Sequence, residues 1–319
     1  MRTSLVWDNH GCLPLLPKDN YLPQLERYRR AGFRVVSINV GYAEKTLQDD
    51  LATINHMRDW ISKNPQTYRL IERVPDIISC FNDGKLGITF DVEGMYPVQQ
   101  DPALVEVLYS LGVRWMLVAY NYSNAAGGGC LDDDGGLTPC GRRLIDAMER
   151  AGMVLCVSHT GSRTASEAID YSRNPVILSH SNPAAMHTHP RNVSDALMKQ
   201  CAATGGVVGI TGINLFLGTS VNLVRRFVDH VRYAIDVVGP KHVGMGLDYV
   251  FDTAELEAAI RENPQHFPTD LGLTELKMIP PEALTEIADQ LSQSGLDDES
   301  VRGVLGKNWL RVAQTVWHS

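Results

Sequence analysis

The stretches MVLCVSHT (153–160) and PVILSHS (175–181) each run through apolar, β-prone residues and then reach a histidine. Their apolarity is continuous rather than alternating, which is typical of strands buried on both faces of a parallel sheet. Eight such runs recur along the chain, at 4–7, 34–40, 86–90, 114–120, 153–158, 175–179, 206–211 and 242–247. Helix-like segments fill the gaps between them. The alternation predicts an α/β fold, a (β/α)8 barrel in a single domain over residues 1–319, with a doubly wound open sheet as the alternative.

Three of the predicted helices stop at a glycine just before a strand begins. These segments are 19–32, 101–112 and 141–152. Glycine adopts the left-handed conformation after a helix at little cost, so it is common where a helix turns into a strand. The three glycines therefore support the alternation of helices and parallel strands.

Composition restricts the classes of partner. With 319 residues and 44% hydrophobic content, the chain can bury a large core. Its net charge of −8 has no long run of one sign, so the sequence predicts neither a nucleic-acid partner nor an anionic membrane surface. No apolar run approaches the roughly 20 residues of a spanning helix, no signal-peptide pattern is present, and the six cysteines form no CxxC. We expect a cytoplasmic protein that acts on a small molecule.

Residues able to bind metal or transfer protons stand at the ends of most of the predicted strands. They are Asp8, His10, Asp91, Glu93, Tyr120, His159, His180 and Asp248. Chemistry in a barrel sits where strands end, so these side chains are expected at one rim. His159 and His180 follow successive strands and are expected to share one metal ion. Glu93 is placed to bridge that ion to a second one, which His10 binds from the opposite side.

This ligand set predicts the metal and the chemistry. Imidazole and carboxylate favour zinc, with cobalt or manganese as alternatives. A hydroxide between two such ions is a nucleophile available at neutral pH. Asp248, after the eighth strand, is placed to manage the proton of that nucleophile.

Nearly the whole chain resembles the membrane (renal) dipeptidase family of zinc peptidases. The resemblance is carried by DNHGCLP (8–14), DVEG (91–94), LYSLGVRWM (108–116), GLTPCGRRLI (136–145), SHT (158–160), SHSNPAAMHTHPRNV (179–193), HVGMGLD (242–248) and GKNWLRV (306–312). It implies that the metal ligands are His10, Glu93, His159 and His180. It also implies that Arg191 holds the substrate carboxylate, which suits a guanidinium fork, and that Asp248 transfers the proton.

Two positions depart from the pattern of that family. Cys12 stands where the family has an aspartate ligand, and we interpret HxC as a modified HxD pair, with a purely structural cysteine as the alternative. Asp8 is a candidate for orienting the His10 ring. Tyr120 replaces a histidine that polarises the substrate carbonyl, and a phenol can still donate a hydrogen bond to an oxyanion. The run AYNYSNAAGGGC (119–130) resembles the loop of bacterial members that share this tyrosine.

Two loops add weaker expectations. The glycine-rich 125–130 lacks the GK[ST] of a phosphate loop, and we expect a flexible lid there. The acidic segment around 249–280 is expected to cap the mouth of the active site. His187 and His189, close to Arg191 in the sequence, are assigned either to substrate contact or to a solvated loop.

The sequence therefore predicts a zinc-dependent hydrolase, with two ions expected, that cleaves the amide bond of a dipeptide or a similar small molecule. Cys12 and Tyr120 keep open the hydrolysis of a non-peptide amide, a cyclic amide or a lactone. A barrel that has lost one metal and serves as a binding protein is a further alternative. The sequence leaves the oligomeric state open, and a homodimer would be unsurprising by base rate.

Overall fold

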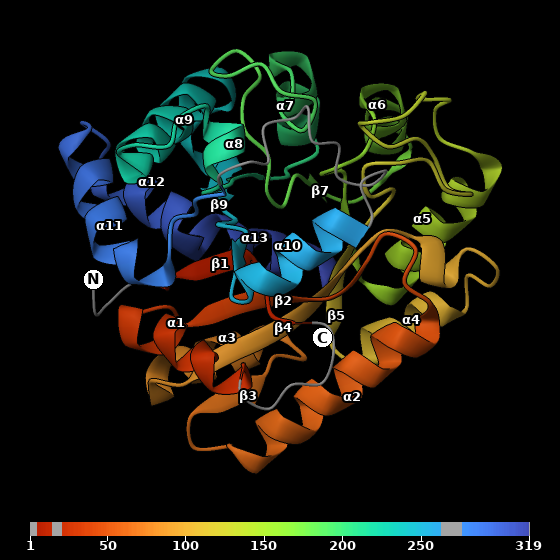
Figure 1. The fold of residues 1–319 in the computed structure, drawn as a ribbon, viewed down its shortest axis with the longest axis horizontal. Helices are drawn as coiled ribbons and strands as arrows, with labels where there is room; N and C mark the ends of the chain where they lie inside the picture. The colour runs from red at the N-terminus through yellow and green to blue at the C-terminus, as the bar shows by residue number, and fades with distance from the viewer. Residues whose placement is uncertain (1–4, 15–20, 263–275, 319) are drawn as a thin grey trace.

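Eight parallel strands form a closed ring in the computed structural model, which describes residues 5–14, 21–262 and 276–318 (Figure 1). The strands of the ring are β1 (Trp7–Cys12), β2 (Val35–Tyr42), β4 (Leu86–Glu93), β5 (Val113–Leu117), β6 (Val154–Cys156), β7 (Val176–Ile177), β8 (Val208–Ile210) and β9 (Val243–Met245). A parallel bridge between Leu178 and Val208 joins β7 to β8. The Asp248 N–H donates to the His10 carbonyl (3.0 Å), which joins the end of β9 to β1. The predicted barrel is confirmed.

Two short strands extend this ring and were not predicted. β3 (Tyr68–Leu70) pairs with the first residues of β4, and β10 (Tyr249–Val250) pairs with the last residues of β1. Both pairings are parallel. β10 therefore carries the chain away from β9 along the end of β1, where Val250 is the register partner of Cys12.

The predicted bounds of the first and third runs are wrong. The first run was expected at 4–7, but β1 spans Trp7–Cys12, so His10 lies inside the strand. Likewise β4 continues to Glu93 instead of ending at residue 90. Polar residues interrupt the apolar pattern in the sequence, while the backbone keeps its ladder with the neighbouring strands. The apolar pattern of the sequence therefore underestimates the length of a strand that carries polar residues near its end.

Helices pack around the strands, most of them as an outer layer, while α10 (Thr253–Glu262) lies in front of the strands in the view of Figure 1. They are α1 (Leu25–Ala31), α2 (Leu47–Lys63), α3 (Val74–Asp83), α4 (Leu104–Ser110), α5 (Pro139–Ala151), α6 (Ser162–Tyr171), α7 (Asp195–Ala203), α8 (Asn214–Leu217), α9 (Leu223–Val238), α10 (Thr253–Glu262), α11 (Leu284–Gln293), α12 (Asp298–Arg302) and α13 (Asn308–Val316). α5 shows why its sequence forms a helix: the Thr138 hydroxyl caps the Gly141 N–H, and Pro139 opens the first turn.

The glycines predicted after helices have the expected conformation. Gly32, Gly112 and Gly152 have φ values of 114°, 112° and 82°. The helix expected over 19–32 is shorter than predicted, because a 3-10 turn (Leu22–Gln24) precedes α1, which begins at Leu25. Residues 15–20 lie outside the described part of the chain.

One apolar cluster joins the interior of the ring to the C-terminal helix α13. Trp7, Trp115 and Ile177 from the strands belong to the same buried cluster as Trp309 and Val316 of α13. The Trp309 indole N–H donates to the Met245 carbonyl (3.0 Å). The centroid of the Trp115 ring lies 5.5 Å from that of the His10 ring, so this apolar cluster packs directly against His10.

A buried carboxyl group on α2 gives a pH-dependent contribution to stability. Asp50 is 1% exposed, lies against Gly41 of β2, and neither carboxyl oxygen has a hydrogen-bond partner among the described residues. Burial is the main cause that raises the pKa of Asp50 from 3.8 to about 8. The folded state therefore holds this proton while the unfolded chain loses it above pH 3.8, so stability falls as pH rises towards 8.

We expect Asp50→Asn, which carries no titratable proton, to remove this loss. Its advantage over the wild type in the free energy of unfolding should grow by about 1.4 kcal/mol per pH unit between pH 5 and pH 7. Urea unfolding at both pH values measures it. Asp59→Asn on the same helix is the matched control, because Asp59 is exposed and pairs with Lys63. An equal effect of the two substitutions would contradict the assignment.

Candidate metal centre

The structure brings all the predicted site residues together where the strands of the ring end. His10, Cys12 and Glu93 lie in the last residues of β1 and β4. The others follow the strands, and they are Tyr120 after β5, His159 after β6, His180 and Arg191 after β7, and Asp248 after β9. Because the strands are parallel, their ends meet at one rim, as the sequence predicted.

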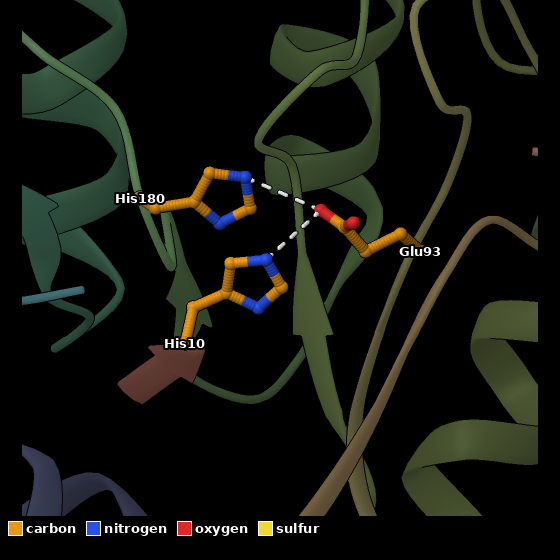
Figure 2. Close-up of side chains that lie close together, drawn as sticks. All are labelled: His10, Glu93 and His180. Atoms are coloured by element: carbon orange, nitrogen blue, oxygen red, sulfur yellow. Dashed lines mark ion pairs between the residues drawn. The ribbon is translucent and has the colours of Figure 1, made fainter. Parts of the chain in front are cut away.

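One oxygen of Glu93 is the meeting point of three imidazole rings. Glu93 Oε1 lies 3.6 Å from His10 Nε2, 3.3 Å from His159 Nε2 and 3.2 Å from His180 Nε2. Figure 2 shows the His10 and His180 rings directing these nitrogens at the same carboxylate oxygen. The His10 and His180 rings are stacked with centroids 4.1 Å apart, and Nε2 of His159 and Nε2 of His180 are 2.8 Å apart.

Nδ1 of each imidazole makes a polar contact on the side of the ring away from Glu93. His10 Nδ1 donates to Asp91, with its two carboxylate oxygens at 3.3 and 3.4 Å. His159 Nδ1 donates to Asn121 Oδ1 (2.7 Å), and the Ser179 hydroxyl is 2.8 Å from His180 Nδ1. Donation from Nδ1 leaves the Nε2 lone pair facing Glu93. This is how metal-binding histidines are usually oriented in proteins.

Cys12 and Asp248 complete a second group of donors around His10. The Cys12 sulfur is 3.5 Å from His10 Nε2 and 3.7 Å from Asp248 Oδ1. His10 Nε2 is 3.5 Å from the same Asp248 oxygen. His10 thus belongs both to this group and to the group around Glu93, and each group has the spacing of a possible metal site.

Burial controls the protonation of these groups. Glu93 and Asp248 are 5% and 9% exposed, and burial raises the pKa of both carboxyls, that of Glu93 to about 8. Burial also lowers the pKa of His159 and His180 well below the ordinary value. For His10, burial opposes protonation, but the charges of Asp91 and Glu93 outweigh it and raise the pKa.

These residues fit a divalent cation. Glu93 Oε1 is buried and has no hydrogen-bond partner within the described residues, although three imidazole nitrogens surround it. Once Glu93 is deprotonated, its oxygen and the Nε2 lone pairs of His159 and His180 repel one another at these distances, and a cation between them removes that repulsion. Zinc takes such nitrogen, oxygen and sulfur donors. The group at Glu93, His159 and His180 and the group at Cys12 together offer ligands for two ions.

Tyr120 and Arg191 are the other two predicted site residues beside the centre. The Tyr120 ring stacks on His159 at 4.2 Å between centroids. Burial, and then the charge of Glu93, raises the pKa of the phenol well above its usual value, so the hydroxyl remains a hydrogen-bond donor. Arg191 is 5% exposed and donates to the His180 carbonyl (3.3 Å), but its Nε has no partner in the described chain. A buried guanidinium with spare donors suits a carboxylate ligand.

The backbone is unusual at the same residues. Asn121, His159 and Asp248 have φ values of 58°, 61° and 60°, in the left-handed region that non-glycine residues seldom adopt. All three contact the centre or its supports. Such conformations are commonly retained at functional sites, where surrounding contacts hold them in place.

Two expectations about this region are wrong. Asp8 does not orient the His10 ring: its carboxylate accepts from Leu247 N (2.8 Å) and the Tyr28 hydroxyl (3.0 Å), while Asp91 holds the ring nitrogen. The glycine-rich stretch is not a lid either, because Gly127 to Gly129 are buried. A side chain on Gly129 would overlap the Asn121 backbone, and Cys130 N donates to the His159 carbonyl (2.9 Å). The stretch therefore packs against Asn121 and His159.

Several supporting residues were missed by the sequence analysis. The Asn39 amide donates to Asp91 (3.1 Å) and to Glu93 Oε2 (3.3 Å). Asn39 stands in the apolar run RVVSINV, where an isolated amide is a signal that could have been noted. Asn121 and Ser179 had no such signal, because each is simply a neighbour of a predicted residue. His189 accepts from Arg191 N (3.1 Å) and so supports the loop that carries the guanidinium.

Together, the closed parallel barrel and the histidine–carboxylate centre at its carboxyl rim define a metal-dependent hydrolase of the barrel type. Residues 21–318 match the membrane dipeptidase family, peptidase family M19. The chain belongs to this family, as the resemblance implied.

Individual relatives agree with this placement. The chain is 27% identical over 299 residues to a dipeptidase of Clonostachys rogersoniana, a match that covers 93% of this chain and 71% of the relative. It is 30% identical over 277 residues to an uncharacterised dipeptidase of Schizosaccharomyces pombe, covering 83% of this chain and 62% of the relative. A solved structure of an amidohydrolase from Pseudomonas aeruginosa superposes with a TM-score of 0.90 at 27% identity, over 99% of this chain and 97% of that one.

Within the described residues, no helix combines the length and the apolarity that crossing a membrane requires.

Proposed function

We propose that the protein is a zinc-dependent dipeptidase whose substrate binds between Arg191 and the centre at Glu93. Membership of the dipeptidase family supports the reaction class. The observation that carries the assignment of the site is the convergence of three Nε2 atoms on the unpartnered oxygen of Glu93, next to a buried guanidinium. The proposed ligands are His10, Cys12, Glu93, His159 and His180.

Two divalent ions bound by these ligands would supply a hydroxide nucleophile at neutral pH and polarise the scissile carbonyl. The remaining tasks fall to side chains. Glu93 lies between two groups of proposed ligands, one at His159 and His180 and the other at His10 and Cys12. It holds these two halves of the centre at a fixed separation, since its Oε1 faces both His10 and His180. Asp91, Asn121 and Ser179 keep the imidazoles in the orientation that presents Nε2.

Substrate orientation and proton transfer are assigned to Arg191, Tyr120 and Asp248. Arg191 grips the terminal carboxylate of the dipeptide, which places the peptide carbonyl near the metal ligands. The Tyr120 hydroxyl donates a hydrogen bond to the oxyanion that develops on that carbonyl. Asp248 accepts the proton from the attacking water and delivers it to the leaving amine.

The segment after β9 is proposed to cap the entrance. β10 pairs with the end of β1, and α10 follows it and crosses in front of β1 and β2 in the view of Figure 1. The charge of Glu255 on α10 contributes to raising the pKa of Tyr42 at the end of β2, after the larger effect of burial. These observations support a cap over the rim. Residues 263–275 of the predicted segment lie outside the described chain.

A cytoplasmic location is also proposed. All six cysteines are free thiols in the structure, including the partly exposed Cys12, Cys130 and Cys140. Unpaired thiols are typical of proteins from a reducing compartment.

The second candidate function is hydrolysis of a non-peptide amide, a cyclic amide or a lactone on the same centre. Tyr120 favours it, because the phenol stacks on His159 in the place where the resemblance implies an imidazole. A dipeptidase and a lactonase would differ in their dependence on a free substrate carboxylate next to Arg191.

A substrate panel separates the two functions. The zinc-loaded protein is assayed on dipeptides of L,L and L,D configuration, on N-acyl amino acids and on lactones. We expect kcat/KM for the best dipeptide to exceed that of the best lactone or N-acyl amino acid by about a hundredfold or more, because the oriented peptide satisfies all the polar groups of the site. A higher value for a lactone or a cyclic amide would select the second function.

A further inference from the structure

The donors around Cys12 have the spacing of three ligands of one metal ion. Cys12 Sγ to His10 Nε2 is 3.5 Å, Cys12 Sγ to Asp248 Oδ1 is 3.7 Å, and His10 Nε2 to Asp248 Oδ1 is 3.5 Å. The buried, unpartnered Glu93 Oε1 lies 3.6 Å from the same His10 nitrogen. These four separations involve one sulfur, one nitrogen and two carboxylate oxygens.

Tetrahedral coordination by zinc predicts nearly these values. With bonds of about 2.3 Å to sulfur and about 2.1 Å to nitrogen or oxygen, neighbouring ligand atoms lie about 3.4 to 3.6 Å apart. The three donors are therefore spaced as three corners of such a tetrahedron. A cysteine that only filled space would have no reason to meet this spacing with an imidazole and a carboxylate.

The other half of the centre has different chemistry. There, the ligand atoms are two imidazole nitrogens and the Glu93 oxygen, with separations of 3.3, 3.2 and 2.8 Å. It has no sulfur donor. The two halves share Glu93 but offer ligands of unequal softness, so they will not prefer the same ions.

We propose that His10, Cys12 and Asp248 form a thiolate metal site, distinct from the site at His159 and His180, that selects a thiophilic divalent ion. Zinc, cobalt and cadmium are the ions of this class, while manganese and magnesium favour oxygen ligands. In this assignment Asp248 is itself a ligand in the resting protein, in addition to its role with protons. Binding replaces the thiol proton of Cys12, which is released to solvent. The inference rests on the proposed function, because both concern the same centre.

The test is Co²⁺ titration of the full-length protein after removal of metal by a chelator. Cobalt bound to a thiolate gives an intense sulfur-to-metal charge-transfer absorption in the near ultraviolet, which nitrogen and oxygen ligands do not give. We expect this absorption in the wild type, saturating as one equivalent fills the Cys12 site. Elemental analysis of the same samples counts the ions in each chain.

Two variants of Cys12 and one control isolate the thiolate. Cys12→Asp should lose the absorption but retain two ions, and its preference for Zn²⁺ over Mn²⁺ should fall by about tenfold or more, since carboxylate is the harder ligand. Cys12→Ala should lose the absorption and one ion. Cys140→Ala is the matched control: Cys140 is also partly exposed but lies on α5, where its sulfur contacts the Gln99 carbonyl. Cys140→Ala should leave the charge-transfer absorption and the number of bound ions unchanged.

The outcomes that overturn the inference are specific. Two cobalt ions bound to the wild type without the charge-transfer absorption would exclude a thiolate ligand, as would an absorption that survives in Cys12→Asp. If Cys12→Ala does not fold, the absorption of the wild type and its loss or survival in Cys12→Asp still decide whether Cys12 is a ligand. Dipeptide hydrolysis, measured in the same samples, tests the proposed function separately: hydrolysis without the absorption refutes only the thiolate site, and the absorption without hydrolysis refutes only the proposed function.

Discussion

Replacing Glu93 with glutamine is expected to lower dipeptide turnover by about a thousandfold or more, because the amide lacks the negative charge that the proposed two-ion site needs. Glu93 Oε1 lies within 3.6 Å of Nε2 of all three imidazoles. Without it the two halves of the centre lose their common ligand. The measurement is kcat at saturating dipeptide and zinc, together with the zinc content of each chain, which should fall below that of the wild type.

The loss should not come from unfolding. Burial raises the pKa of Glu93 to about 8, so the metal-free protein already carries an uncharged side chain there at neutral pH. The metal-free variant should therefore be within about 1 kcal/mol of the wild type in unfolding free energy. Glu106→Gln, on the exposed face of α4, is the control and should keep full activity. Normal turnover by Glu93→Gln would refute the proposed mechanism.

Replacing Arg191 with methionine is expected to reduce kcat/KM for dipeptides by about a hundredfold to a thousandfold. The guanidinium is buried, and its unpartnered Nε offers a donor that a substrate carboxylate can accept. The loss should appear mainly in KM if Arg191 binds substrate and transition state equally. Steady-state kinetics of both proteins on one dipeptide measure this split.

A dipeptide amide gives the decisive comparison for Arg191. Its terminal carboxylate is absent, so the wild type should hydrolyse it poorly and the substitution should have little further effect. Arg163→Met is the control, because Arg163 lies on the outer helix α6 and pairs with Glu167. It should leave kcat/KM unchanged for both the dipeptide and the dipeptide amide. An equal loss on dipeptide and dipeptide amide would mean that Arg191 supports the His180 loop instead of binding the carboxylate.

The barrel and the clustering of the proposed ligands could be predicted because both leave repeated signals in the sequence. Buried parallel strands give continuous apolar runs, and His159 and His180 follow two successive runs. The site roles of Arg191 and Cys12 came instead from the resemblance, since neither stands at the end of a predicted strand. The placement of all these residues at one rim follows from the parallel direction of the strands.

The supports of the centre were less accessible because they depend on register and on loop packing. Asn39 and Asp91 face each other as register partners in β2 and β4, which no property of either segment alone reveals. Asp8 and Asp91 are both acids near a ligand, and only the fold shows that Asp91 reaches His10 Nδ1. The glycine-rich stretch was misread as a lid because glycine marks mobility in some loops and close backbone packing in others. Here the packing against Asn121 requires it.

The most direct test is zinc titration of the metal-stripped protein, with elemental analysis and dipeptide hydrolysis measured at each step. We predict that the stripped protein is inactive, that two zinc ions bind to each chain, and that hydrolysis rises to its maximum as the second ion binds. Hydrolysis that persists without metal, or a protein that binds zinc fully and cleaves no dipeptide, would contradict the assignment of this centre as a two-metal dipeptidase site.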